Sequence, residues 1–186
     1  MIDNKRIKWL ILIFIGVVVA GISGFLHEVG HYITSYSFGF EPQLSFTNGG
    51  RVFYKSAIEN TPILQQVIVL MAGPLITFLL AIGFTLVWFR FQHSYILFFI
   101  ALWNSTFRLN VLIDGARSDE WKTSDLLNLP HILIPLCSVI ISISLTYLLA
   151  KQQRLFNMNY WLIPLGWVLC MLYYKISFGM LSLVYG

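Results

Sequence analysis

Two histidines and a glutamate stand close together at the end of the first long apolar stretch. His27 and His31 are four residues apart, and Glu28 lies between them in the order His-Glu-Val-Gly-His. On a helix, residues four apart share one face, so both imidazoles can bind one zinc ion while the carboxylate reaches a water at the metal. This H-E-x-x-H spacing predicts a zinc site with His27 and His31 as ligands and Glu28 as the general base.

These side chains also have an ordinary structural interpretation. Histidine and glutamate are tolerated where a membrane span meets water. An acid between two histidines in apolar surroundings, however, carries a desolvation cost unless it is paired or coordinated, so ionisable groups within a span are candidates for function. A bound metal ion would offset that cost directly, which favours the metal site.

A catalytic zinc ion needs a third protein ligand and one open position for water. Asp114 follows an apolar run that ends at Ile113, so it is expected at the end of a span. That span runs in the same direction as the first, which places Asp114 and His31 on one side of the membrane. We therefore predict Asp114 as the third ligand. Asp119, farther out in a loop on the same side, is the alternative, and His93 falls on the opposite side.

The elements that must position these residues are strongly apolar. Of 186 residues, 58% are hydrophobic and 11% are charged, against about 25% charged residues in ordinary soluble domains. A span needs about 20 apolar residues. Five stretches meet that need: Trp9 to Leu26 continuing through Tyr36, Ile63 to Phe89, Tyr95 to Ile113, His131 to Ala150, and Tyr160 to Val184. We expect an all-α polytopic protein of the cell membrane, with residues 1–186 as a single domain.

Charge and cysteine usage exclude other classes. The net charge of +4 comes from 12 Lys and Arg residues that are spread thinly, so a nucleic-acid partner is not indicated. Cys137 and Cys170 lie within apolar runs, where they behave as small hydrophobic residues. The first apolar stretch could be a signal peptide, but it continues past Leu26 without a small-residue cleavage site, so we expect a retained span.

The connection after the first stretch carries a hairpin pattern. Leu44 and Phe46 on one side, and Val52 to Tyr54 on the other, flank Asn48-Gly49, a pair typical of hairpin turns. An open sheet edge cannot face lipid, so a hairpin here must be sheltered by helices or line a wet cavity. We expect a short membrane-associated β-hairpin whose edge, at Phe46 or Val52, could bind an extended substrate. An amphipathic surface loop is the alternative.

Three segments resemble motifs of the site-2 protease type of intramembrane zinc metalloprotease. His27 to His31 matches the family's H-E-x-G-H form, Ala72 to Leu75 matches its A-G-P-L segment, and Asp114-Gly115 matches the D-G that ends its third core helix. Order and spacing agree over residues 20 to 115. Thr106 and Leu109 stand where the family usually has Asn and Pro. Asn104 and Asn110 are the nearest substitutes, and Asn104 is the candidate for holding substrate.

The resemblance implies a fold and a site. It implies a three-helix catalytic core within residues 9–115 and zinc bound by His27, His31 and Asp114, with Glu28 as base. Residues 116–186 then add a loop and two further spans. With no recognisable regulatory or PDZ-like insert, the chain would be a minimal form of the family.

Together these features predict a zinc metalloendopeptidase with one Zn²⁺ per chain. Its substrate would be a membrane-embedded protein or peptide, cut in or beside the bilayer by water that Glu28 deprotonates. Two alternatives stay open: a membrane metal-binding or transport protein, and an inactive relative acting as a partner protein. A transporter is expected to show repeated halves or a second polar site near the midplane. The last two stretches offer only weakly polar side chains such as Ser138, Ser142 and Ser144, together with Lys175.

Overall fold

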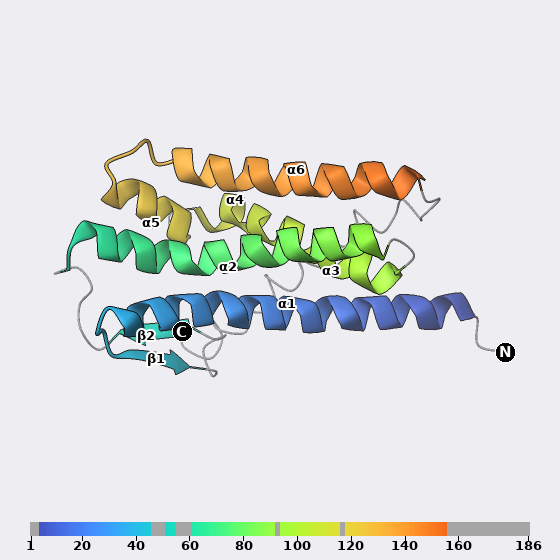
Figure 1. The fold of residues 1–186 in the computed structure, drawn as a ribbon, viewed down its shortest axis with the longest axis horizontal. Coiled ribbons are helices and arrows are strands. Elements are labelled where there is room, and N and C mark those ends of the chain that lie inside the picture. The colour runs from blue at the N-terminus through green and yellow to red at the C-terminus, as the bar shows by residue number, and fades with distance from the viewer. Residues whose placement is uncertain (1–3, 46–50, 55–60, 92–93, 116–117, 156–186) are drawn as a thin grey trace.

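The computed structural model describes residues 4–45, 51–54, 61–91, 94–115 and 118–155 (Figure 1). Helices make up most of this part of the chain. In order, the elements are α1 (Asn4–Ser37), β1 (Pro42–Ser45), β2 (Arg51–Tyr54), α2 (Ile63–Arg90), α3 (Tyr95–Phe107), the 3₁₀ turn η2 (Arg108–Asn110), α4 (Val111–Asp114), α5 (Asp119–Leu126) and α6 (Leu133–Leu155). The fifth predicted span, Tyr160 to Val184, lies outside the described residues.

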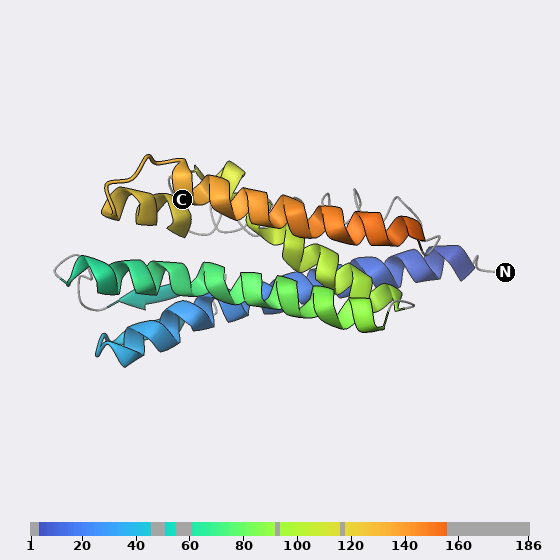
Figure 2. The ribbon, with the colours of Figure 1, turned by 45° about the horizontal axis from the view of Figure 1, so that its top comes forward.

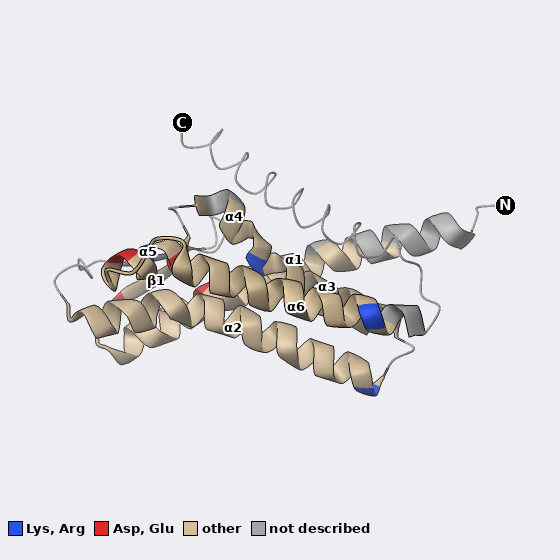
Figure 3. Cartoon of the chain, turned by 90° about the horizontal axis from the view of Figure 1, so that it is seen from above, with Lys and Arg blue, Asp and Glu red and all other residues tan. Residues whose placement is uncertain are grey.

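Three of the described helices are long and apolar enough to cross a membrane. They are residues 14–37 of α1, the whole of α2, and residues 133–152 of α6. Large apolar side chains such as Phe14, Leu79 and Ile140 remain exposed on their outer faces, as expected of helices that face lipid. Figure 3 shows little charge along α2 and α6, and acidic residues near α5. The chain therefore has the character of a membrane protein, and the count of five spans stays a prediction.

The helices pack lengthwise around α3. Figures 1 and 2 show α1 and α2 running side by side, with α3 against both and α6 against α3. At the C-terminal end of α2, Trp88 packs with Phe98, Leu102 and Leu149 in a fully buried apolar cluster. The polar side chains described below lie nearer the N-terminal end of α2, so the bundle has an apolar end and a polar end.

The third predicted span is broken rather than continuous. Helix α3 ends at Phe107, and the chain passes through η2 before α4 ends at Asp114. Just before the break, the hydroxyls of Ser105 and Thr106 each donate to the Leu102 carbonyl at 2.9 Å. Such hydroxyl bonds compete with the helical pattern and bend helices. After the break, α4 packs against α6 before α5 begins.

The two strands lie between α1 and α2 in the chain. They pair antiparallel, with Leu44 opposite Val52, and both contact α1. Their side chains from Leu44 onward lie outside the described residues, as does all of Phe46. A membrane-associated position for these strands, and a substrate role for Phe46 and Val52, stay predictions.

Candidate metal centre

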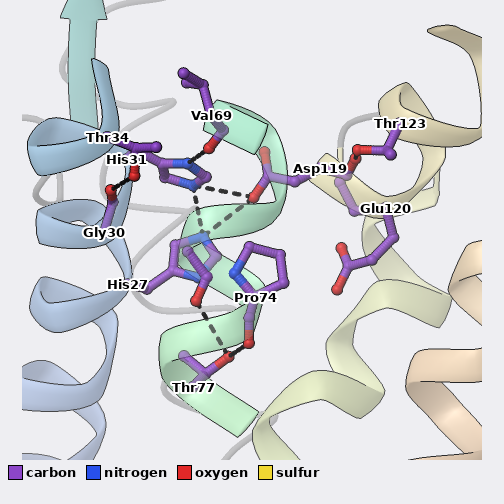
Figure 4. Close-up of polar contacts among 12 residues, drawn as sticks. His27, Gly30, His31, Thr34, Val69, Pro74, Thr77, Asp119, Glu120 and Thr123 are labelled. Carbon is purple, nitrogen blue, oxygen red and sulfur yellow. Dashed lines mark hydrogen bonds and ion pairs between the residues drawn. The ribbon is translucent and has the colours of Figure 1, made fainter. Parts of the chain in front are cut away.

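The rings of His27 and His31 converge near the C-terminal end of α1. Both residues are buried, with 9% and 6% of their surface exposed, and their Nε2 atoms lie 3.1 Å apart. Their separation of four residues on a continuous helix puts them on one face, which is turned toward α2 (Figure 4). Two imidazole nitrogens are thereby directed at one point in the interior.

His31 is oriented by the backbone of α2. Its Nδ1 lies 2.7 Å from the Val69 carbonyl oxygen, which can only accept, so Nδ1 carries the proton and donates it. The neutral ring then has a free lone pair on Nε2. A hydrogen bond from the second ring nitrogen to a carbonyl is the usual way in which proteins orient a metal-binding histidine. His31 is thus oriented to bind a cation through Nε2.

Asp119, the first residue of α5, completes a triangle of possible ligands. Its Oδ2 lies 3.1 Å from Nε2 of His27 and 3.3 Å from Nε2 of His31. Tetrahedral ligands about 2.0–2.1 Å from a zinc ion lie about 3.3–3.4 Å from one another. The three edges of 3.1, 3.1 and 3.3 Å are close to that size. Among the described residues, these three form the group that could hold a metal ion.

Helix α5 holds Asp119 in place through its own first turn. The Ser118 side chain caps the helix by accepting a hydrogen bond from the Trp121 amide. Thr123 donates its hydroxyl proton to the Asp119 carbonyl at 2.7 Å. Ser124 is fully buried and accepts from the Ile134 amide of α6. The polar residues of this short helix therefore fix a carboxylate between the long helices.

Asp119 stays ionised in this setting. Burial alone would raise the pKa of its carboxyl, but the contacts with His27 and His31 outweigh burial and hold that pKa well below its usual range. The site therefore offers one negative charge and imidazole nitrogens, a donor set suited to Zn²⁺.

Helices α1 and α2 approach closely because two glycines face each other's helix. A Cβ on Gly30 would lie 2.8 Å from the Ala72 carbonyl oxygen. A Cβ on Gly73 would lie 2.4 Å from Nε2 of His31 and 2.6 Å from Cε1 of His27. The wall of the site on the α2 side is therefore bare backbone, and no side chain fits there beside the two rings.

Gly73→Ala should abolish tight zinc binding, because the added methyl group would occupy the space beside His31 Nε2. Gly83→Ala on the same helix is the matched control, since a Cβ there would meet nothing within 4 Å. Alanine favours a helix over glycine by about 1 kcal/mol, so neither change should unfold α2. Zinc content per chain, with thermal unfolding in detergent, measures both effects. Normal zinc content in the Gly73 variant would contradict the crowding argument.

A buried ion pair lies behind the site. Arg108 of η2 is 5% exposed and Glu120 of α5 is fully buried, and Arg108 Nε lies 3.4 Å from Glu120 Oε1. Burial raises the pKa of the Glu120 carboxyl, and the positive charge of Arg108 opposes that rise. Arg108 Nη1 also lies 3.3 Å from Nδ1 of His27. Arg108 thus contacts His27, a possible ligand, and Glu120, the residue that follows the possible ligand Asp119.

The remaining predicted residues have different positions. Glu28 is half-buried on α1 and interacts electrostatically with His31. Asn104 is 1% exposed and connects two helices, because its Oδ1 accepts from Ser23 of α1 at 2.8 Å and its Nδ2 donates to the Ile100 carbonyl. The side chain of Asp114 lies outside the described residues, although its backbone ends α4.

The structure also adds residues that the motifs did not select. The sequence favours Asp114 over Asp119 as the third ligand, because residues 114–130 are expected to form a connection. Ser118 followed by two acids is a helix-start signal, and it could have identified the short helix that holds Asp119 against the histidines. No sequence signal paired Arg108 with Glu120.

Comparison with known proteins identified no relative of this chain. No family model, curated protein or solved structure matches this chain. The function proposed below therefore depends on the residues of the chain and their geometry.

Proposed function

We propose that this protein is an intramembrane zinc metalloprotease of the site-2 protease type. The observation that carries the proposal is the triangle formed by His27 Nε2, His31 Nε2 and Asp119 Oδ2, with edges of 3.1–3.3 Å. Its two histidines lie in the helix that carries the H-E-x-x-H pattern, within residues 14–37 that could span a membrane, and Asp119 comes from α5. Three residues that could bind one metal ion therefore occur together in an apolar helical bundle.

The third ligand in this proposal is Asp119 rather than Asp114. Asp119 lies within contact distance of both imidazoles, whereas the side chain of Asp114 is not described. Three protein ligands leave the fourth tetrahedral position for water, the arrangement of catalytic zinc sites. His₂Asp is a donor set of the kind that zinc accepts.

The reaction is hydrolysis of a peptide bond. A zinc ion held by His27, His31 and Asp119 would lower the pKa of a water molecule toward about 7 and would polarise the scissile carbonyl. Glu28 takes the proton from the attacking water and later gives it to the leaving amine. The Val69 carbonyl keeps His31 in the tautomer that can bind a cation, and Gly73 keeps the space beside the rings open.

The substrate class follows from the position of the site. The site lies between α1 and α2, which both contain stretches that could cross a membrane, so the scissile bond belongs to a membrane-embedded protein or peptide. A helical substrate must unwind to expose its carbonyls, and the paired strands β1 and β2 beside α1 could hold the unwound segment by strand addition. We place the protein in the cell membrane.

The direct test uses the purified chain in detergent. We expect about one zinc ion per chain and cleavage of some members of a panel of single-span substrates. Removal of zinc with a chelator should stop cleavage, and added zinc should restore it. His27→Ala combined with His31→Ala should lose the metal, whereas His131→Ala, at an exposed histidine paired with Asp125, should keep it.

Two outcomes would change the proposal. Full zinc occupancy in the double-histidine variant would remove these residues as ligands. Stoichiometric zinc that depends on His27 and His31, without cleavage of any substrate, would favour a metal-binding or transport protein or an inactive relative.

A further inference from the structure

Arg108 places a buried positive charge directly behind one of the proposed metal ligands. Its Nη1 lies 3.3 Å from Nδ1 of His27, and its Nε lies 3.4 Å from the carboxylate of Glu120. The guanidinium also packs over the Phe107 ring, 5.5 Å from its centroid. The contacts with Glu120 and Phe107 hold the charged group against the imidazole.

The contact with Arg108 determines which nitrogen of His27 carries the proton. A guanidinium only donates hydrogen bonds, so Nδ1 of His27 must be the acceptor. A neutral imidazole carries one proton, which then lies on Nε2 and is donated to Asp119 Oδ2, 3.1 Å away. This tautomer is the reverse of that of His31, whose Nδ1 donates to the Val69 carbonyl.

A metal ion on His27 requires the other tautomer. The ion needs the lone pair of Nε2, so the proton must lie on Nδ1, where metal-binding histidines usually donate to an acceptor. An Nδ1–H group and the guanidinium are both donors and cannot hydrogen-bond. The Arg108 contact and the metal ion on His27 therefore exclude each other.

Charge acts in the same direction as hydrogen bonding. A guanidinium that touches the ring of a ligand repels a divalent cation on the far side of the ring, and this repulsion is larger in a buried setting than in water. Glu120 offsets part of the charge, and it also keeps Arg108 beside His27. Both effects weaken the binding of a metal ion.

We propose that Arg108 competes with the metal ion for His27 and thereby sets the metal affinity of the site. Glu120 is the positioning residue that keeps the guanidinium within reach. This inference rests on the proposed metal centre. Competition by Arg108 makes the metal affinity of the site lower than the ligand triangle alone would give. A metal ion that binds His27 must break the contact between Arg108 and His27.

The test measures zinc affinity of the purified full-length chain in detergent, by competition with a chromogenic chelator. Arg108→Met should bind Zn²⁺ at least about tenfold more tightly than the wild type, because the competing donor and charge are gone. Arg90→Met is the matched control, since Arg90 is exposed at the end of α2, where its guanidinium packs over the Phe91 ring, far along the helix from Gly73. Its affinity should equal that of the wild type.

A second comparison tests the proposal even if the Arg108→Met variant folds poorly. Arg108→Met leaves Glu120 buried without its partner, which is costly, whereas replacing both members of a buried pair with apolar residues is often tolerated. Arg108→Met/Glu120→Met should therefore also bind Zn²⁺ more tightly than Glu120→Met alone. A purely structural arginine would give weaker binding when removed, so the direction of the change separates the two roles.

The outcomes distinguish this proposal from the metal centre itself. Unchanged or weaker zinc affinity in both Arg108 comparisons, with zinc still dependent on His27 and His31, would overturn the role of Arg108 alone. Zinc binding that survives the double-histidine change would overturn both the metal centre and the competition.

Discussion

Glu28→Gln should reduce cleavage by at least about 100-fold while zinc content and thermal stability stay close to those of the wild type. The amide keeps the shape of the side chain but cannot accept the proton from water, and loss of a general base costs about 10²–10⁴-fold. Glu28 is half-buried next to the two histidines, so a change of charge alone should not unfold α1. The measurement is single-turnover cleavage of one accepted substrate, with zinc content determined on the same preparations.

Glu41→Gln provides the control for Glu28. Glu41 is exposed just after α1 ends, so its loss should leave cleavage unchanged. Near-normal turnover in the Glu28 variant would exclude it as the base. Unfolding of that variant would support a structural role for the carboxylate.

Asp119→Asn should weaken zinc binding and cleavage together, by at least about 100-fold. A neutral amide is a poorer zinc ligand than a carboxylate, and the change also removes the negative charge that the two imidazoles stabilise. Changing a residue that only hydrogen-bonds to a metal ligand already lowers metal affinity or activity by about 10–100-fold. Zinc affinity, measured by titration, and the rate of cleavage should therefore both fall in the Asp119→Asn variant.

Asp114→Asn is the comparison that decides between the two aspartates. It should leave zinc affinity largely unchanged if Asp119 is the ligand. Zinc loss in the Asp114 variant, with retention in the Asp119 variant, would move the ligand to Asp114 and restore the match to the D-G motif.

Long apolar helices were predictable because the physical requirement behind them is simple. The stretch predicted as Ile63 to Phe89 is the helix Ile63–Arg90, and that predicted as His131 to Ala150 is the helix Leu133–Leu155. Backbone groups in a membrane must be satisfied within the segment, so apolar length alone indicates a helix. The break at Arg108 was not predictable from length, because it depends on hydroxyl bonds and on a buried ion pair.

The arrangement of the candidate metal centre was predictable only where its residues are close in sequence. His27 and His31 meet because of helical spacing, which the sequence shows directly. Asp119 meets them across 92 and 88 residues, and its position depends on how α5 packs between α2 and α6. Likewise, Arg108 had several candidate partners in the sequence, and only the folded structure brings its side chain within 3.4 Å of Glu120.

The distance of the histidines from the end of α1 determines how far inside its own span a substrate would be cut. Helix α1 ends at Ser37, six residues after His31 and ten after His27, which is about 9 and 15 Å along the helix axis. In the proposed protease, a bond must reach this depth to be cut. It would lie about six to ten residues inside a substrate span that stays helical up to the cut, or about three to five residues inside one that is extended. Cleavage sites should therefore cluster near one end of the substrate span rather than at its middle, and residues added outside the span should not move them.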